Sequence, residues 1–438
     1  MNYKETCEYL YNQMPMFERQ GASGYKEGLS NTLALDEHLG HPHQAYKTIH
    51  VGGTNGKGSV SHTIASVLQV CGYRVGLYTS PHLVDFRERI RINGKPISQQ
   101  YVVNFVEEHR SFFEPLHPSF FEVTTAMAFQ YFKDRNIDIA VVEVGLGGRL
   151  DCTNIIQPLV SVITNISFDH TQFLGNTLAK IAGEKAGIIK RGTPVVIGET
   201  NAETRPVFEA KAREMDAPII FADDKPQVMS AEPRKDGGMH YHLKLMGQMD
   251  GDLGGIYQEW NLNTALFAFE EIRKLGYLAS TVEGKTYERC RLELEKGVGN
   301  VAKNTGLMGR WQTVNQIPKV VCDTGHNVGG WLYLSRQLDT IQCQQMHIVF
   351  GMVDDKDIDK VLDLLPKHAN YYFTKAQNKR AINETLLLKK ANEHSIKGKS
   401  YPTVNEAYKA AYRSASANDF IFVGGSSYVV GDFLRDCI

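Results

Sequence analysis

A glycine-rich segment near the N-terminus, residues 52–59 (GGTNGKGS), has the composition of a phosphate-binding loop. It follows an apolar strand pattern and opens a helical pattern, so backbone N–H groups and a helix N-terminus can surround an anion. Lys57 adds a positive charge for β- and γ-phosphates, and a nearby hydroxyl can meet Mg²⁺. The usual pattern is altered, because Val51 replaces a glycine and Gly58 separates the lysine from Ser59. We predict a variant phosphate-binding loop, with an ordinary strand-to-helix turn as the alternative.

Two more polar residues stand where apolar strand patterns end. Glu143 closes the run IDIAVVE, and Ser80 follows the run RVGLY within the segment TSPH. The C-terminal ends of parallel strands face the ligand crevice, and a carboxylate near a phosphate loop is a natural Mg²⁺ ligand. The residues alone leave open that Glu143 starts a surface loop and that Ser80 belongs to a plain turn stopped by Pro81.

Asp169 and His170 come just after another strand pattern, LVSVIT, and they could hold a metal or position a phosphate. A lone histidine is more often structural, so that alternative stays open for His170. Lys185 lies in GEKAGIIK, on the helical pattern that follows. Composition alone favours a solvated lysine at this position.

The C-terminal third repeats the arrangement. Asp323 ends the strand pattern KVVCD, and His326 follows it in the segment DTGHN. Arg310 comes after a polar, glycine-rich segment and could reach a nucleotide or stay an exposed charge. Trp260 and Trp331 are expected to pack rather than to stack on a ligand. Polar groups at strand ends in both parts favour a ligand held between two domains.

The elements that must position these residues alternate between strands and helices. Nearly continuous apolar runs followed by helices are typical of parallel sheets covered on both faces. We expect such strands at 48–51, 74–78, 137–144, 159–164 and 194–197, and again at 319–323, 346–351, 370–374 and 420–425. Further expectations are a hairpin at 89–97 turning on Asn93-Gly94, a small antiparallel excursion at 223–252, a helix at 281–296 and a linker at 297–310.

The fold class that follows is α/β with two domains. We predict an N-terminal P-loop ATPase-like parallel-sheet domain over residues 1–299, which carries the phosphate-binding loop. A smaller C-terminal Rossmann-like α/β domain is expected over residues 300–438. A chain of 438 residues agrees with two or three domains at roughly 100–200 residues each.

Composition excludes several classes of function. Lys plus Arg number 48 and Asp plus Glu number 49, so the net charge of −1 argues against a chain-wide grip on nucleic acid or anionic lipid. No apolar run approaches the roughly 18 residues of a membrane span. The seven cysteines are scattered and form no CxxC pair, which favours reduced thiols in a cytosolic protein over a disulfide framework.

Ten segments occur in the order found in the folylpolyglutamate synthase/dihydrofolate synthase family, which is related to the Mur peptidoglycan ligases. They are GGTNGKGS, YTSPHL, EVGLGGRLDCTN, FDH, GEKAGIIK, YQEWNLNTAL, MGRWQ, DTGHN, GMVDDKD and GGSSYVVGDF. The chain resembles this family from about residue 17 to its C-terminus, and TNGKGS with TSPHL is specific to the folate branch. The resemblance, best to the bifunctional bacterial type, implies an ATP-dependent amide ligase. Such an enzyme transfers the γ-phosphoryl group to a substrate carboxylate, and L-glutamate attacks the acyl phosphate.

The resemblance also assigns roles to residues of this chain. It implies that Ser80 and Glu143 bind one Mg²⁺, that His170 binds a second, and that Lys185 is carbamylated. Lys57, His170 and Lys185 would act in catalysis, while His82, Arg87 and the segment 24–31 would contact dihydropteroate or a folate. The implied protein is a cytoplasmic monomer acting on small molecules, with no nucleic acid or membrane partner. The implied ATP site comprises Thr54, Asn55, Gly56, Lys57, Gly58, Ser59, Asn261, Arg310, Asp323 and His326.

The chain departs from the family pattern at a few positions. Met308 stands where proline is frequent, Leu262 replaces a common alanine, and DTGHNV replaces the usual DGAHNP. These changes affect loop geometry rather than the charged groups. Two alternatives remain. One is a Mur-type ligase for a UDP-sugar substrate, against which Gly58 and TSPHL count. The other is a non-catalytic nucleotide-binding regulator, against which the joint retention of Lys57, Glu143, His170, Lys185 and Asp323 counts.

Overall fold

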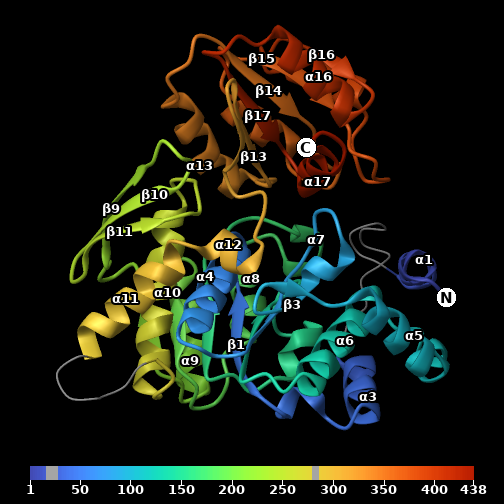
Figure 1. Ribbon diagram of the computed structural model, residues 1–438, viewed down its shortest axis with the longest axis vertical. Helices are drawn as coiled ribbons and strands as arrows, with labels where there is room; N and C mark the ends of the chain where they lie inside the picture. Colours follow the sequence, from blue (N-terminus) through green and yellow to red (C-terminus); the bar gives the residue numbers. More distant parts are fainter. Residues whose placement is uncertain (16–27, 279–285) are drawn as a thin grey trace.

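The computed structural model describes residues 1–15, 28–278 and 286–438, and the structural statements below concern these residues. Two β-sheets, of eight and six strands, form the centres of two bodies that follow each other along the chain. In Figure 1 the larger body lies below, and the smaller body, coloured orange to red, lies above it. The predicted α/β class, with a largely parallel sheet in each part, is confirmed.

The larger sheet has the strand order β4-β3-β2-β5-β1-β6-β7-β8, and it is parallel from β2 to β8 in this order. Helices cover both faces, which is why strands such as β5 read as continuous apolar runs. The strands are β1 (Lys47–Gly52), β2 (Val75–Tyr78), β3 (Ile90–Ile92), β4 (Lys95–Pro96), β5 (Ile139–Glu143), β6 (Val160–Ile163), β7 (Val195–Ile197) and β8 (Ile219–Phe221).

Helices of the larger body divide between the two faces of this sheet. Helix α4, buried along nearly its whole length, packs with α10 and α11 on one face, while α3, α5 and α6 cover the other beside β2 and β5. The helices are α1 (Tyr3–Gln13), α3 (Ser30–His38), α4 (Lys57–Val70), α5 (Gln99–Phe113), α6 (Phe120–Asp134), α7 (Thr171–Leu174), α8 (Leu178–Ala186), α9 (Arg205–Glu214), α10 (Gln258–Lys274), α11 (Thr286–Val298) and α12 (Val301–Thr305), with short 3₁₀ helices η2 (Pro42–Gln44), η3 (Phe86–Arg89), η4 (Glu114–Leu116) and η5 (Cys152–Ile155).

Two local predictions are confirmed. Strands β3 and β4 pair antiparallel around Asn93 and Gly94, whose φ angles of 46° and 73° suit a tight hairpin turn. The expected excursion forms a three-stranded antiparallel sheet of β9 (Val228–Pro233), β10 (Met239–Leu243) and β11 (Gly247–Gly251). Of the helix predicted from residue 281, residues 281–285 lie outside the described part, and α11 begins at Thr286.

The smaller sheet has the order β12-β13-β17-β14-β15-β16, with β12 antiparallel at one edge and the other strands parallel. Trp331 is fully buried against Phe350 and Phe422, as its predicted packing role requires. The elements are β12 (Gln312–Gln316), β13 (Lys319–Asp323), β14 (Met346–Phe350), β15 (Asn370–Thr374), β16 (Gly398–Tyr401), β17 (Phe420–Gly424), α13 (Val328–Asp339), α14 (Ile358–Leu364), α15 (Glu384–Glu393), α16 (Val404–Ser414) and α17 (Ser427–Asp436).

The segment 297–310, expected to be a linker, contains helix α12, so that prediction is wrong in part. This helix packs on α4 of the larger body: Thr305 Oγ1 lies 2.7 Å from His62 Nδ1, and Asn304 Nδ2 donates to Ser66 Oγ at 3.0 Å. The domain boundary at 299/300 stays a prediction. These contacts join α12 to the larger body, and the chain enters the smaller sheet at Gln312.

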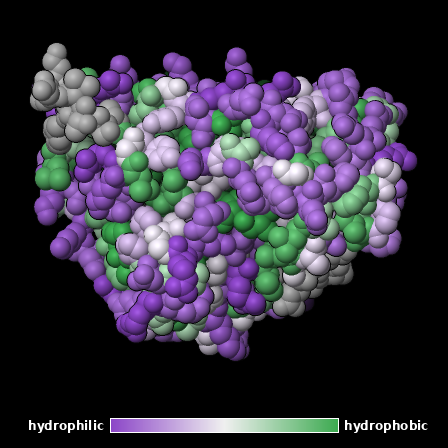
Figure 2. Space-filling view, turned by 90° about the horizontal axis from the view of Figure 1, so that it is seen from below, coloured by the Kyte–Doolittle hydropathy of each residue, from purple (hydrophilic) through white to green (hydrophobic). Residues whose placement is uncertain are grey.

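The surface carries a mixture of side chains. Figure 2, which views the molecule from below, shows hydrophobic groups set between more extensive hydrophilic areas. Within the described ranges, no helix combines the length and the apolar character that a membrane crossing needs. All seven cysteines lie in the described residues as free thiols.

Candidate active site

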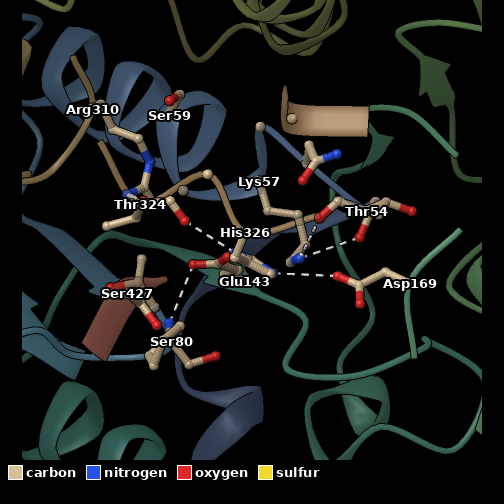
Figure 3. A pocket seen from close by; sticks show the side chains of 18 of the residues that line it. Thr54, Lys57, Ser59, Ser80, Glu143, Asp169, Arg310, Thr324, His326 and Ser427 are labelled. Atoms are coloured by element: carbon tan, nitrogen blue, oxygen red, sulfur yellow. Dashed lines mark hydrogen bonds and ion pairs between the residues drawn. The ribbon is translucent and has the colours of Figure 1, made fainter. Parts of the chain in front are cut away.

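A cavity of about 280 Å³ lies between the two bodies. Its walls come from the C-terminal ends of β1, β2, β5, β6 and β7, from the start of α10, and from the loops after β13 and β14. Figure 3 shows Lys57, Glu143 and His326 converging from different elements. The cavity brings together Thr54, Asn55, Gly56, Lys57, Gly58, Ser59, Ser80, Glu143, His170, Lys185, Asn261, Arg310, Asp323 and His326.

Contacts from outside hold the loop between β1 and α4 in shape. Gly53 and Gly56 have φ angles of 136° and 83°, which side-chain-bearing residues rarely adopt. A Cβ at Gly56 would overlap Asn261 Oδ1, so the buried amide of α10 lies directly on the loop. The N–H of Asn55 donates to Asn165 Oδ1 at 3.0 Å. The loop is thus held from both α10 and the end of β6.

The extra glycine in the loop faces the second body. A Cβ at Gly58 would lie 3.1 Å from Arg310 Nη2, so glycine lets the guanidinium approach the first turn of α4. Arg310 also donates to Thr324 Oγ1 and, at 3.2 Å, to the carbonyl of Gly309. The departure noted in the sequence therefore makes room for a cation beside the phosphate loop.

Two lysines converge on one backbone carbonyl. Lys57 Nζ donates to the carbonyl of Gly53 at 3.2 Å and to that of Thr54 at 3.1 Å, and Lys185 Nζ donates to Gly53 at 2.8 Å. Lys185 is only 5% exposed, so the solvated alternative is wrong. Burial, together with the charge of Lys57, lowers the pKa of Lys185 to about 7. At neutral pH, Lys185 is therefore a neutral, nucleophilic amine in a large fraction of the protein molecules.

Glu143 and Ser80 lie side by side because β5 and β2 are neighbouring strands. The N–H of Ser80 donates to Glu143 Oε2 at 3.2 Å. Burial raises the pKa of Glu143, and the charge of Lys57 opposes this. A carboxylate and a hydroxyl are oxygen donors that fit a hard divalent cation. Among the described residues, no three or more His, Cys, Asp or Glu side chains are grouped so that they could hold a metal ion.

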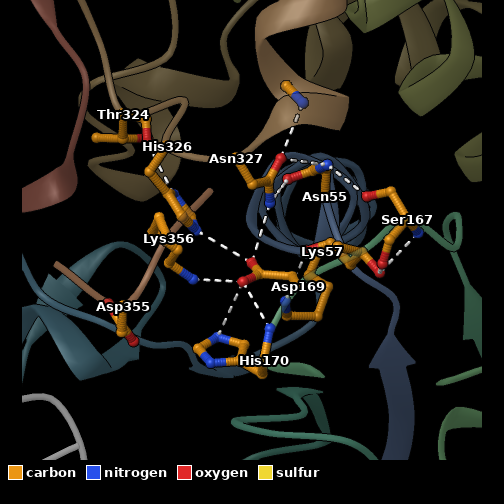
Figure 4. A network of polar contacts seen from close by, with 12 residues as sticks. Asn55, Lys57, Ser167, Asp169, His170, Thr324, His326, Asn327, Asp355 and Lys356 are labelled. Carbon is orange, nitrogen blue, oxygen red and sulfur yellow. Dashed lines mark hydrogen bonds and ion pairs between the residues drawn. The ribbon is translucent and has the colours of Figure 1, made fainter. Parts of the chain in front are cut away.

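Asp169 joins the two bodies (Figure 4). Its Oδ2 accepts from Asn327 Nδ2 at 3.0 Å and lies 3.3 Å from His326 Nε2, while its Oδ1 pairs with Lys356. Burial would raise the pKa of Asp169, but the charge of Lys356 and the hydrogen bond to His326 hold it well below its usual range. Burial lowers the pKa of His170 to about 3. His170 is then neutral at pH 7, which is the form of imidazole that binds metals. The positive charge next to Asp169 at this pH therefore comes from Lys356.

Asp323 is fixed by its surroundings at the end of β13. Its carboxylate accepts from the N–H of Trp311 at 2.7 Å, from the N–H of Gly325 at 2.8 Å, and from the hydroxyl of Tyr257 before α10. Burial raises its pKa. Asp323 therefore links the smaller body to the start of α10 as well as lining the cavity.

The two residues predicted to bind the pterin substrate do not line the cavity. The ring of His82 stacks on Tyr11 of α1 with 6.1 Å between centroids, and Arg87 pairs with Asp85 at 2.8 Å. Their role stays a prediction, and Tyr11 is an additional aromatic neighbour that the sequence did not indicate. Of the predicted segment 24–31, residues 24–27 lie outside the described part of the chain.

Sequence reasoning missed other cavity-lining groups. Glu199 follows β7 and Lys356 follows β14, so the strand-end rule that selected Glu143 would also have found them. Tyr333 lies on α13 and donates to Glu199 Oε2 at 2.9 Å. No local motif indicates Tyr333, since its contact depends on how the two bodies meet.

Comparisons with known proteins agree with this architecture. Residues 51–232 match the Mur ligase middle domain, and residues 309–427 match the Mur ligase glutamate ligase domain. The dihydrofolate synthase/folylpolyglutamate synthase of Bacillus subtilis is 32% identical over 425 residues, covering 94% of this chain and 95% of the relative. The probable bifunctional folylpolyglutamate synthase/dihydropteroate synthase of Haloferax volcanii is 30% identical over 443 residues, covering 99% of this chain. The chain spans about half, 50%, of that longer relative.

Solved structures show the same arrangement. The folylpolyglutamate synthase of Mycobacterium tuberculosis, complexed with ADP and AMPPCP, superposes with a TM-score of 0.84 at 31% identity and covers 100% of both chains. A bifunctional folylpolyglutamate synthase/dihydrofolate synthase with Mn, AMPPNP and L-glutamate bound gives a TM-score of 0.78 at 28% identity, covering 98% of this chain and 97% of that one. The chain therefore belongs to the folylpolyglutamate synthase/dihydrofolate synthase family of Mur-type ligases.

Proposed function

We propose that this chain is an ATP-dependent ligase that joins L-glutamate to dihydropteroate, to a folate glutamate tail, or to both. One observation carries the proposal: the phosphate loop with Lys57, the oxygen pair of Ser80 and Glu143, and the buried amine of Lys185 face a single cavity. Relatives named for folate ligation match nearly the whole chain. They favour a folate substrate over a UDP-sugar and an enzyme over a non-catalytic regulator.

The cavity has the parts that phosphoryl transfer requires, namely charge neutralisation and positioning. In the first step a substrate carboxylate oxygen bonds to the γ-phosphorus, the bond to ADP breaks, and an acyl phosphate forms. In the second step the glutamate amine bonds to the acyl carbon, the C–O bond breaks, and phosphate leaves as the amine loses its proton. Lys57 and Arg310 lie beside the loop as the cations that neutralise the transferred phosphoryl group.

Magnesium ions belong to the same proposal. Ser80 and Glu143 would hold one ion and His170 a second, and a bound ion neutralises phosphate oxygens and keeps them in line for transfer. We also propose that Lys185 is carbamylated. Its buried amine, with the pKa lowered to about 7, can form an N–C bond with CO₂ and release a proton. The product is an anion beside the phosphate loop in place of a second lysine cation.

The substrates and the setting complete the proposal. We expect the pterin to lie beside His82 and Arg87, in the segment that follows Ser80 along the chain. The resemblance to the family further implies a cytoplasmic monomer that acts on small molecules without nucleic acid or membrane partners.

ADP release by the purified protein tests the function. Mg-ATP and L-glutamate are supplied with dihydropteroate, with tetrahydrofolate, or with no pterin. Glutamate-dependent release with dihydropteroate alone would indicate a dihydrofolate synthase, release with tetrahydrofolate alone a tail-extending ligase, and release with both the bifunctional enzyme. No release with either pterin, in a protein that still binds ATP, would contradict the proposal.

A further inference from the structure

One wall of the cavity holds a carboxylate that the proposed reaction does not use. Ser80 follows β2 and Glu143 ends β5, and both strands lie on one side of the phosphate loop in the strand order. Glu199 follows β7 on the other side. The γ-phosphate end of a nucleotide must face the oxygens that suit a divalent cation. The base of that nucleotide then extends in the opposite direction, toward the side of the cavity lined by Glu199.

The carboxylate of Glu199 is held in a fixed orientation. Tyr333 donates its hydroxyl to Oε2 at 2.9 Å, and Asn165 donates its Nδ2 to Oε1 at 3.2 Å. The Oδ1 of the same Asn165 accepts the N–H of Asn55 at 3.0 Å, which ties the carboxylate to the phosphate loop. Each carboxylate oxygen can accept more than one hydrogen bond, so both oxygens of Glu199 retain acceptor capacity toward a ligand. Within the described lining, this pair of Glu199 and Tyr333 also spans the two bodies.

We infer that Glu199, positioned by Tyr333 and Asn165, accepts a hydrogen bond from the 6-amino group of a purine and thereby selects adenine nucleotides. The inference rests on the proposed function, because it takes the nucleotide to bind at the phosphate loop. Adenine presents a donor at position 6, whereas hypoxanthine and guanine present an oxygen there. When the purine presents an oxygen at position 6, that oxygen and the carboxylate oxygen of Glu199 are both acceptors with no hydrogen between them. A buried site that leaves its acceptor unpaired in this way discriminates strongly against the wrong ligand.

The test compares ATP with ITP, which replaces the 6-amino group with an oxygen and leaves the ribose and phosphates unchanged. We would measure kcat/KM for both nucleotides in the wild type, Glu199→Gln, Tyr333→Phe and Glu203→Gln. The wild type should prefer ATP by roughly 10- to 100-fold, the range of one lost hydrogen bond in a polar site. Glu199→Gln should narrow this ratio about tenfold, because its amide can donate to the oxygen of ITP. Tyr333→Phe should narrow it less, since the carboxylate remains.

Glu203→Gln is the matched control, because Glu203 is exposed on the turn that follows and should keep the wild-type ratio. If Glu199 only tied α13 to the larger body, its loss would weaken activity with both nucleotides equally, and that result would overturn the inference. Calorimetric binding of ADP and IDP to the wild type and to Tyr333→Phe decides the matter should Glu199→Gln not fold. Equal affinities in the wild type would contradict the inference. Ligation at equal rates with ATP and ITP would refute this inference and leave the proposed function intact. Absence of ligation with ATP would refute the proposed function. In that case the affinities for ADP and IDP would still test the inference.

Discussion

The strand ends of the two bodies face the same cavity, but their charged groups are held differently. In the larger body Glu143 accepts from Ser80, and Lys185 donates to Gly53, so these groups are positioned by their own body. In the smaller body Lys356 finds its partner, Asp169, across the interface. Substitutions of Glu143 or Lys185 should therefore lower the rate of the catalysed reaction. Substitutions at the interface should weaken the assembly of the site.

Lys57→Ala should have the largest effect. Losing this charge at the phosphate loop should lower kcat/KM for ATP by roughly 10³-fold, the scale of a removed transition-state cation. The fold should persist, because the hydrogen bonds of Lys57 Nζ to the described residues go to the backbone carbonyls of Gly53 and Thr54. ADP release and thermal unfolding measure the two properties separately. The control is Lys47→Ala, at the exposed far end of β1. Normal turnover by Lys57→Ala would contradict the assignment of residues 52–59 as a phosphate-binding loop.

Lys185→Ala should come next, with a loss of about 10²-fold or more, since it would remove a charged group at the reacting phosphates. Short-chain carboxylic acids should restore part of the activity by occupying the place of the carbamate. The control is Lys180→Ala, an exposed lysine on the same helix, which should keep full activity without rescue. A fully active Lys185→Ala enzyme would contradict the proposed role.

Asp169→Asn tests the interface. It leaves the Lys356 ammonium, only 8% exposed, without its carboxylate, and removing one partner of a buried pair costs about 3–5 kcal/mol. We expect a lower unfolding temperature and a higher KM for ATP. Asp236→Asn breaks an exposed pair with Arg234 and should cost about 0–1 kcal/mol. Adding Lys356→Met to Asp169→Asn should recover part of the stability. If Asp169→Asn and Asp236→Asn lowered the stability equally, the contact across the interface would have no special role.

A pH effect should be the smallest. Burial lowers the pKa of Lys185 from 10.5 to about 7, so the folded protein carries roughly tenfold more neutral amine at pH 8 than at pH 6. Between these two pKa values the unfolded chain binds the extra proton, so this group adds stability as pH rises through that window. Carbamate formation needs the neutral amine. We expect CO₂-depleted enzyme to regain activity with bicarbonate severalfold better at pH 8 than at pH 6. Recovery independent of pH would argue against a carbamate.

The sequence predicts residues at strand ends well and contacts between the two bodies poorly. Lys57 and Glu143 stand at the ends of apolar runs, and a parallel sheet brings such ends to one edge whatever the details of packing. Asp323 follows the same rule in the smaller body. The Asn93-Gly94 turn signal located the hairpin, and the break in the strand–helix alternation located the antiparallel excursion.

What escaped prediction depends on contacts between distant elements. Composition alone makes Lys185 a surface lysine, because a short helix pattern does not say which face meets the phosphate loop; the family resemblance is what indicated Lys185 as a site residue. The partners of Asp169 lie on the other body, and their positions follow from docking rather than from local pattern. Helix α12 escaped because its polar, glycine-rich sequence resembles a linker, while its packing on α4 supplies the helix with its partners.

The short connection after α12 has a consequence for how the site assembles. Helix α12 is fixed to the larger body, and β12 of the smaller sheet begins at Gln312. So short a tether keeps the second body at an effective concentration on the order of millimolar or more, even when the cavity is open. Any opening and closing of the cavity would then be an event within one molecule, with a rate that does not depend on protein concentration. The same two halves, severed near residue 307, would have to meet by diffusion, and their activity would rise with the square of protein concentration until they paired.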